Sequence, residues 1–554
     1  MKVFFHKMAH RSLMLSALAL AVLCMLPHLG VLIAALTGSA DTLLHLISTV
    51  MAEYLSTTAI LVVLVGLGTC AVGTGAAWLV TMTEFPGRRW IEIALVIPLA
   101  FPAYVLAYAY THLLDHPGIV QSTLRAVMGY GPRDYWFPEI RSLGGAAIML
   151  TLVLYPYVYL LARTAFMGQS ATVFHAARSL GKTPMQAFWR VSLPMARPAI
   201  AAGVLLTAME TIADFGTVSY FSVQTFATGI YTSWFSMGDR AAAAQLSLGL
   251  LAFALLLAFM ERFTRGNARY AAAKAKTPLE RTVLSGFQAW GAVALCLLPV
   301  LLGVVIPTIA LTVMGIGSEQ NLLSARYLKF ISNTVTLALI AAGLTVVAAI
   351  VLGAFQRSFG GALSDGALYA ARLGYAVPGG VIAVGLLVPF AAFDNALDAW
   401  MRETFDISTG LLFTGSIWLL IGAYMIRFLA AALGAYEGGI STVTTNMDSA
   451  ARVLGKGVWG VIGKVHLPIL TPSLMTAALI VFVDVMKELP ATLIMRPFNY
   501  DTLAVQAFRL AADERLEGAA VPSLVIAGIG LLPVILLCRK VGKDAAKLSR
   551  QDCP

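Results

Sequence analysis

The chain has 554 residues, of which 59% are hydrophobic and 12% charged, and its formal net charge at pH 7 is +10. Soluble domains carry about 25% charged residues, so this composition excludes a soluble enzyme or binding domain. Apolar stretches of about 20 residues, long enough to cross a bilayer, recur along the whole sequence. The sequence therefore predicts an all-α integral membrane protein that is surrounded by the lipid bilayer.

Twelve membrane spans are expected, six on each side of a basic, Ala-rich stretch at 261–285. This stretch is expected to be a cytoplasmic linker between a first half, 1–260, and a second half, 286–554. Because six is an even number, both halves enter the membrane from the same side and form a parallel repeat. The expected spans are 12–36, 55–82, 90–111, 144–167, 198–221, 243–260, 286–314, 331–355, 374–393, 410–434, 472–493 and 520–538.

The positions of Lys and Arg predict the orientation of these spans. With the N-terminus in the cytoplasm, most of the 38 basic residues fall in inner segments, among them 168–197 and 435–471. Cytoplasmic loops of membrane proteins carry this excess of positive charge. We therefore expect both termini in the cytoplasm. We expect no nucleic-acid partner, because the basic residues are spread over several inner segments instead of forming one face.

Two smaller features recur in both halves. The second span of each half begins with polar residues, at 56–58 in the first half and at 332–334 in the second. The third span of each half contains proline, Pro98 and Pro102 in the first half and Pro378 in the second. These matches support an internal repeat that covers the membrane helices.

A short motif occurs once in each half, on the predicted cytoplasmic side. The first copy reads Ala176-Ala177-x3-Gly181-x9-Val191-x-Leu193-Pro194. The second copy lies 274 residues later and reads Ala450-Ala451-x3-Gly455-x9-Val465-x-Leu467-Pro468. Paired alanines allow close packing of a short helix, and the glycine permits a break in that helix.

Apolar side chains follow the glycine of each copy, Phe188 and Trp189 in the first and Trp459 and Ile462 in the second. Exposed aromatic residues on a basic cytoplasmic helix are suited to docking into a groove of a partner protein. The alternative is a loop helix that only lies on the membrane surface. Because the segment is duplicated at a fixed spacing, docking is the favoured interpretation.

The two segments resemble the "EAA" loop of ABC importer permeases, Glu-Ala-Ala-x3-Gly-x9-Ile-x-Leu-Pro. This resemblance implies a fold like that of type I importer permeases, in which each loop forms a coupling helix that seats in an ATPase subunit. Both copies depart from the pattern at its first position, where His175 and Ser449 replace glutamate. The coupling residues carried over by the resemblance are His175, Ala176, Ala177, Gly181, Phe188, Trp189, Leu193, Pro194, Ser449, Ala450, Ala451, Gly455, Trp459, Ile462, Leu467 and Pro468.

Ionisable residues occur inside the fifth span of each half. Glu210 and Asp214 in the first half correspond to Asp484 and Glu488 in the second, and Lys487 lies beside the second pair. A spacing of four places each pair on one face of a helix. Ionisable residues inside a membrane are costly and commonly mark a transport pathway, so these five residues are predicted to line one. The alternative is that they hold helices together by hydrogen bonds.

Carboxylates are hard oxygen ligands that suit hard cations. A transporter must release its cargo, so we expect no stable metal site, only transient contact of a metal cargo with Glu210, Asp214, Asp484 and Glu488. Sequence around these acids, at 213–231, 486–504 and 513–517, resembles fused iron(III) ABC permeases. This resemblance covers nearly the full chain.

The resemblance implies a permease in the bacterial inner membrane, with ferric iron as cargo. It implies two copies of a cytoplasmic ABC ATPase and a periplasmic substrate-binding protein as partners. ATP–Mg is then used by the ATPase, so this chain is expected to be no enzyme and to bind no cofactor itself. Fused permeases for thiamine or phosphonate share the architecture and stay open as alternatives. A proton-coupled secondary transporter, with the membrane acids as a relay, is a further alternative.

Overall fold

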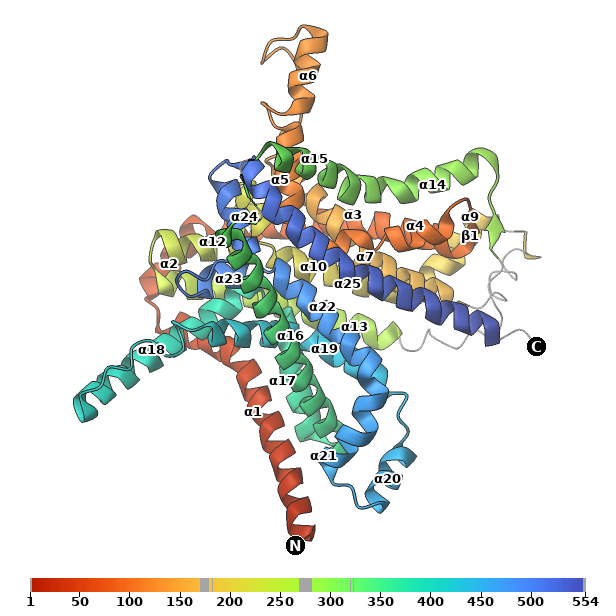
Figure 1. The fold of residues 1–554 in the computed structure, drawn as a ribbon. Coiled ribbons are helices and arrows are strands. Elements are labelled where there is room, and N and C mark those ends of the chain that lie inside the picture. The colour runs from red at the N-terminus through yellow and green to blue at the C-terminus, as the bar shows by residue number, and fades with distance from the viewer. Residues whose placement is uncertain are drawn as a thin grey trace. The chain divides into compact units, whose positions relative to one another are not determined.

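A computed structural model describes residues 2–169, 179–181, 183–268, 281–318, 320–321 and 323–551 of the chain. Nearly all of these residues are helical (Figure 1). The strands among them are β1 (Thr83–Glu84) and β2 (Thr282–Val283), which pair in parallel. The predicted all-α membrane fold is confirmed.

Ten helical segments in the described part of the chain are long and apolar enough to cross a membrane, and a bent helix pair gives an eleventh. The predicted span at 520–538 falls in α25, whose described apolar part is Leu516–Leu531, so the count of twelve stays a prediction. The ten segments are contained in α1 (Lys2–Thr37), α3 (Met51–Met82), α7 (Leu143–Met167), η2 (Phe188–Ser192) with α10 (Leu193–Ala213), α13 (Arg240–Ala268), α14 (Gly286–Val300) with α15 (Ile306–Gly317), α16 (Ala325–Phe359), α18 (Gly379–Phe405), α19 (Ile417–Ile440), and α21 (Val458–Val461) with α22 (Leu467–Lys487).

The third span of the first half is broken, where the sequence predicted one helix at 90–111. Its pieces, α4 (Arg88–Ala94) to η1 (Ile97–Ala100) and α5 (Ala103–Leu114) to α6 (Ile119–Met128), meet at a bend of 93°. Pro102 is extended, with ψ 141°, and it has no backbone N–H to donate to the preceding turn, so a new helix starts after it. In the second half, α17 (Ala362–Ala376) ends just before Pro378, and α18 begins just after it.

The chain folds into two compact units that interleave the two sequence halves. Each unit combines the middle part of one sequence half with the beginning and the end of the other half. Thus α1 packs against α16, α17 and α18, and α15 packs against α5 and α25 (Leu516–Gln551). Unit 1 comprises residues 1–49, 229–255 and 322–505, and unit 2 comprises residues 50–228, 256–321 and 506–554.

Aromatic residues fill the middle of each unit. In unit 2, Tyr155 and Tyr159 of α7 are fully buried between α3 and α10. In unit 1, Tyr436 of α19 packs against Leu470 of α22, and it also lies against Gly353 of α16. A Cβ at position 353 would lie 2.1 Å from the Tyr436 ring, so only glycine fits there. These cores fix the helices that carry the motif loops.

Candidate coupling loops and membrane carboxylates

The two copies of the motif have the same backbone geometry. Gly181 and Gly455 both have a left-handed conformation, with φ of 77° and 76°, which glycine adopts without steric cost. A short α-helical turn follows in each copy, α9 (Pro184–Ala187) or α21. The predicted coupling residues His175, Ala176 and Ala177 lie outside the described residues.

A π-helical turn comes next in each copy, η2 in the first and η5 (Ile462–His466) in the second. The N–H of Leu193 donates to the carbonyl of Phe188, five residues back, and Leu467 donates likewise to Ile462. Each leucine precedes the proline of the motif, which has no N–H to donate. The Leu-Pro pair therefore marks the point where the π turn gives way to the membrane helix.

The apolar side chains after the glycine divide between interior and surface. Trp189 and Trp459 are exposed, at 61% and 44%, and Trp459 donates a hydrogen bond to Ser12 Oγ at 3.1 Å. Phe188 and Ile462 are buried, and the Phe188 ring lies 4.8 Å from that of Trp78. The prediction of an exposed side chain at 188 and 462 is wrong, because these residues anchor each turn to its own unit.

Sequence reasoning missed one exposed apolar residue in each loop. Leu180 is 80% exposed and Leu454 is 78% exposed, and each directly precedes the left-handed glycine. The signal was available, because the two leucines hold the same position within the repeated motif. Large apolar side chains exposed at equivalent places are typical of protein contact sites.

Helix α20 (Thr445–Val453) gives the second loop a wider apolar face. Met447, Ala450, Val453 and Leu454 are all exposed, and their spacing of three, three and one places them along one side of a helix. Ser449 is exposed as well, whereas Ala451 is buried. Further along the loop Leu467 and Pro468 are exposed, and the equivalent Leu193 and Pro194 are half-buried.

A buried charge cluster holds α20 in place. Asp448 accepts hydrogen bonds from Arg357 Nε at 2.6 Å and from His466 Nε2 at 2.8 Å, while Arg357 Nη2 also donates to the carbonyl of Val443 at 2.7 Å. Burial raises the pKa of Asp448, but the hydrogen bonds from Arg357 and His466 outweigh it and lower that pKa below its usual value. The carboxylate thus stays ionised and fixes one side of α20, which leaves its apolar side outward.

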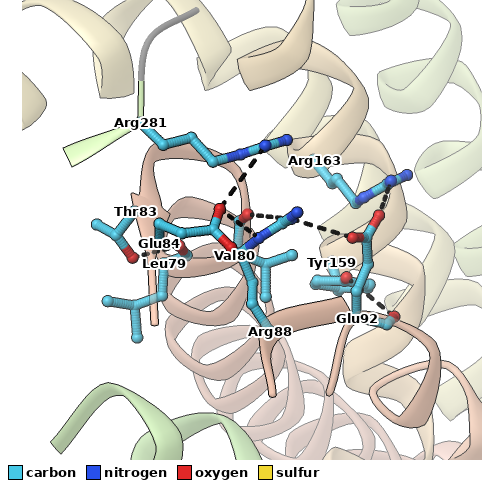
Figure 2. Close-up of polar contacts among 9 residues, drawn as sticks. All are labelled: Leu79, Val80, Thr83, Glu84, Arg88, Glu92, Tyr159, Arg163 and Arg281. Atoms are coloured by element: carbon cyan, nitrogen blue, oxygen red, sulfur yellow. Dashed lines mark hydrogen bonds and ion pairs between the residues drawn. The ribbon is translucent and has the colours of Figure 1, made fainter. Parts of the chain in front are cut away.

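A second charge network lies at the end of the linker (Figure 2). Arg88 pairs with Glu84 at 3.0 Å and with Glu92 at 3.2 Å, and Glu92 also pairs with Arg163. Arg281, which precedes β2, lies 3.8 Å from Glu84. The pairing of β1 with β2 adds backbone hydrogen bonds at the same place. The end of the predicted linker is therefore connected, through Glu84, Arg88 and Glu92, to Arg163 on the helix that leads into the first loop.

The second half repeats this interhelical ion pair with its charges exchanged. Arg163 of α7 corresponds to Glu437 of α19 at the 274-residue offset. Arg163 pairs with Glu92 of α4, whereas Glu437 pairs with Arg372 of α17. Each pair joins the fourth helix of its half to the helix that precedes the proline break.

Two of the membrane carboxylates, Asp214 and Glu488, lie at helix breaks. Helix α10 ends at Ala213 and α22 ends at Lys487, and Asp214 and Glu488 are extended with ψ of 129° and 124°. Glu210 and Asp484 lie inside α10 and α22, one turn before these ends. The expected spans 198–221 and 472–493 are interrupted at the same two positions.

Asp214 and Glu488 instead start the short helices α11 (Gly216–Tyr220) and α23 (Pro490–Met495). Asp214 accepts hydrogen bonds from the N–H groups of Thr217 and Val218, at 3.1 and 3.2 Å. Glu488 accepts from those of Ala491 and Thr492, at 3.0 and 3.1 Å. A carboxylate at a helix start satisfies backbone donors and complements the helix dipole.

The charges around these acids differ between the halves. Glu488 pairs with Arg427 at 3.0 Å, and Asp484 pairs with Lys487 at 2.9 Å. The residues that correspond to Arg427 and Lys487 in the first half are Val153 and Ala213. The cations of the second half thus have no positional equivalents around Glu210 and Asp214.

The polar residues predicted at the start of the second spans also have a defined role. Thr58 Oγ1 accepts a hydrogen bond from the N–H of Phe226 at 3.4 Å, where α12 (Phe226–Tyr231) begins. Thr334 Oγ1 accepts one from Leu503 at 2.9 Å, where α24 (Leu503–Ala512) begins. No group of three or more His, Cys, Asp or Glu side chains within the described ranges could hold a metal ion.

Comparisons with known proteins agree with the resemblance of the duplicated loops to those of ABC permeases. No protein-family model matches. The Fe(3+)-transport system permease protein FbpB 2 of Haemophilus influenzae is 27% identical over 498 residues, which is 88% of this chain and 90% of the relative. The probable ABC transporter permease protein y4fN of Sinorhizobium fredii is 25% identical over 82% of each chain. The chain is a fused ABC transporter permease.

A shorter relative matches only part of the permease. The molybdenum transport system permease protein ModB of Escherichia coli is 25% identical over 186 residues, which is 32% of the permease and 78% of ModB. A chain that matches one third of the permease across most of its own length fits a single half. The permease is thus a multi-pass membrane protein that carries two such halves in one chain.

Proposed function

We propose that the permease forms the translocation pathway of a binding-protein-dependent importer for ferric iron in the bacterial inner membrane. The cargo is supported by three relatives named as ferric or Fe(3+) permeases, which align over 74 to 88% of this chain. Both termini face the cytoplasm in this proposal, since that orientation places most Lys and Arg inside. Cargo arrives on a periplasmic substrate-binding protein at the opposite face.

Two copies of a cytoplasmic ATPase bind the permease, one at each motif loop. The single observation that carries this assignment is the repeated geometry of the loops, with Leu180 and Leu454 exposed beside equivalent left-handed glycines. ATP–Mg belongs to the ATPase, and the permease itself neither hydrolyses ATP nor binds a cofactor. The exposed tryptophans Trp189 and Trp459 extend the same docking surface.

Each loop is joined to its membrane carboxylate by one helix. After the π turn, α10 and α22 each run for 21 residues, or about 30 Å at 1.5 Å per residue, and end directly before Asp214 or Glu488. Movement of an ATPase against the loop is therefore carried along a helix to the start of α11 or α23. This mechanical link is how ATP use opens and closes the pathway.

The coupling assignment is tested with Leu180→Asp and Leu454→Asp together. A charge at an apolar contact disrupts docking, so ATP-driven uptake in proteoliposomes should fall at least tenfold while the permease still inserts. Ile407→Asp is the matched control, because Ile407 is 53% exposed but lies in the predicted outer loop after α18. Full uptake in the double variant would contradict the assignment.

The cargo is tested by uptake of labelled ferric ion into proteoliposomes that contain the permease, its ATPase and its binding protein. Uptake that requires ATP and the binding protein is the expected result. Stimulation of the ATPase by a binding protein loaded with thiamine or phosphonate, without iron uptake, would keep the importer and replace its cargo. Uptake driven by a proton gradient without the ATPase would overturn the importer.

A further inference from the structure

Exposed aromatic side chains gather in unit 2 where the linker enters the second half. Helix α4 begins with Arg88, Arg89 and Trp90, and α14 begins with Gly286 and Phe287. Trp90 is 80% exposed and Phe287 is 93% exposed. The paired strands β1 and β2 come just before these two helices, and α4 packs against α14. The two aromatic residues therefore lie at the same end of unit 2.

The exposed face of α14 continues from this end along a membrane helix. Phe287, Trp290, Ala294 and Leu298 are all exposed, and their spacing of three, four and four places them on one side of the helix. Helix α14 belongs to a segment that is long and apolar enough to cross a membrane, so this side faces lipid. Tryptophan at the end of such a helix is typical of the boundary between membrane and water.

Positive charge is in excess at the same end. Two glutamates, Glu84 and Glu92, balance the two arginines that pair with them most closely in the network of Figure 2. Arg281 is a third arginine, and its Nη1 lies 3.8 Å from Glu84 Oε2, too far for a hydrogen bond. Arg89, next to Arg88 in the chain, is exposed. Arg281 and Arg89 thus add positive charge that the two glutamates do not neutralise.

The surroundings of Arg281 disfavour its charge. Burial and the neighbouring Arg88 cation lower the pKa of Arg281 below its usual value, and Glu84 offsets this only in part. The Arg281 side chain is still 42% exposed, so an anion can reach it from outside the protein. Basic residues beside the cytoplasmic end of a membrane helix attract the headgroups of anionic lipids. A negatively charged headgroup is therefore the ligand that this place favours.

The second copy of the repeat lacks these residues. Gly87 and Gly361 both have a positive φ, of 73° and 85°, and α4 and α17 begin directly after them. The start of α17 reads Ala362-Leu363-Ser364, without a cation or an aromatic ring. Leu13 and Ser16 of α1 hold the positions that correspond to Phe287 and Trp290 of α14. The combination of arginine and tryptophan is therefore specific to the end of unit 2 that the linker joins.

We propose that Arg89 and Arg281, flanked by Trp90 and Trp290, bind the headgroup of an anionic phospholipid in the inner leaflet of the membrane. Guanidinium groups donate strong hydrogen bonds to phosphate oxygens, and the tryptophan rings hold this end of unit 2 at the level of the headgroups. A bound lipid fastens the end of the linker to the membrane surface. The proposal uses the predicted orientation of the permease, but neither its cargo nor its ATPase.

Native mass spectrometry of the full permease in detergent, titrated with phosphatidylglycerol or phosphatidylcholine, measures the affinity for each lipid. The wild type should bind phosphatidylglycerol at least tenfold more tightly. Arg89→Gln and Arg281→Gln should each lower the affinity for phosphatidylglycerol about fivefold and leave that for phosphatidylcholine unchanged. Trp90→Ala should weaken the binding of both lipids alike, because the ring does not distinguish the headgroup charge.

Arg372→Gln is the matched control, because Arg372 is also exposed on the predicted cytoplasmic side but is paired with Glu437. This variant should keep the wild-type affinity for phosphatidylglycerol. Equal affinities of the wild type for the two lipids, or an unchanged affinity in the variant that lacks both Arg89 and Arg281, would overturn the site. An equal loss in Arg372→Gln would do the same, since it would reflect net charge alone. Tighter binding of inorganic phosphate than of phosphatidylglycerol would assign the arginines to a soluble anion and overturn the lipid.

Discussion

Asp214 in the first half and Glu488 in the second occupy the same position at the end of equivalent helices, yet their surroundings differ. Both cap a short helix through two backbone N–H groups. Glu488 is also paired with Arg427, whereas Val153 occupies the equivalent position of the first half. Helix capping requires only a carboxylate in an extended conformation, so it survives while the neighbouring charges diverge. The repeat therefore preserves backbone geometry more strictly than charge.

The largest expected effect comes from removing the cation of the second half. Arg427→Met leaves Glu488, whose side chain is 2% exposed, as a buried and unpaired charge, and this should cost about 3–5 kcal/mol of stability. Unfolding of the permease in nanodiscs by denaturant measures the loss. Arg402→Met is the control, because its pair with Asp398 is exposed and worth about 0–1 kcal/mol. Equal losses in the two variants would contradict a buried pair.

A smaller effect is expected from Gly379→Ala at the same place. A Cβ at 379 would lie 2.2 Å from Arg427 Nη1 and 2.4 Å from Glu488 Oε1, so the pair must move apart. Overpacking of this kind costs about 1–3 kcal/mol. The matched control is Gly380→Ala, where the nearest atom is 3.9 Å away, and denaturant unfolding compares the two. The first half already has Ala103 at the corresponding position, which agrees with the absence of an arginine at 153.

The contribution of Asp448, with its Arg357 and His466 partners, to the stability of the permease should depend on pH. The pKa of Asp448 is lower in the folded permease than in the unfolded chain, so its contribution to stability is fully present above the ordinary aspartate pKa of about 3.9. That contribution is lost as the pH falls through the lowered value. Asp448→Asn should therefore be less stable than the wild type at pH 7, by about 1–3 kcal/mol for a lost charged hydrogen bond.

Thermal unfolding of both proteins between pH 7 and pH 3 measures this dependence. The difference between wild type and Asp448→Asn should shrink at the acid end, where the carboxyl group becomes protonated. A difference that stays constant with pH would show that the Arg357 and His466 contacts do not depend on the ionised carboxylate. Asp365→Asn, at an exposed position near the start of α17, serves as the control.

The smallest effect is expected from the exchanged ion pairs. Glu437→Arg places like charges opposite Arg372 and should cost about 0–1 kcal/mol, because both side chains are partly exposed. Adding Arg372→Glu recreates the charge order of the first half and should restore the stability. The melting temperatures of the single and double variants give the coupling. Failure of the double variant to recover would mean that the exchange is not tolerated at this position.

The membrane fold and the two loops could be predicted because their signals are contained in short stretches of sequence. Span length follows from hydrophobicity, and the loops follow from a motif repeated at one offset. The breaks at Asp214 and Glu488 could not be predicted in this way, since hydropathy continues across them and the break depends on a side chain capping the next helix. Gly216 and Pro490, at the starts of those helices, were the available local signal.

The orientation of the loop side chains was out of reach for a different reason. Phe188 and Ile462, the first residues of the two π turns, are buried beside exposed tryptophans. Their burial depends on tertiary packing, such as that of Trp78 of α3 against Phe188, which the local sequence does not contain. The Arg427–Glu488 pair was also missed, because the two residues lie 61 positions apart on different helices.

The exchange of helices between the two units affects how the permease is made in the cell. Helix α1 leaves the ribosome about 300 residues before α16, α17 and α18, against which it packs. At a synthesis rate of about 5–20 residues per second, α1 waits on the order of tens of seconds in the membrane without these neighbours. In the other unit, α25 follows α5, against which it packs, by about 400 residues. Neither unit is complete before residue 505 has been made, so the membrane insertion machinery has to hold both units while some of their helices are still missing.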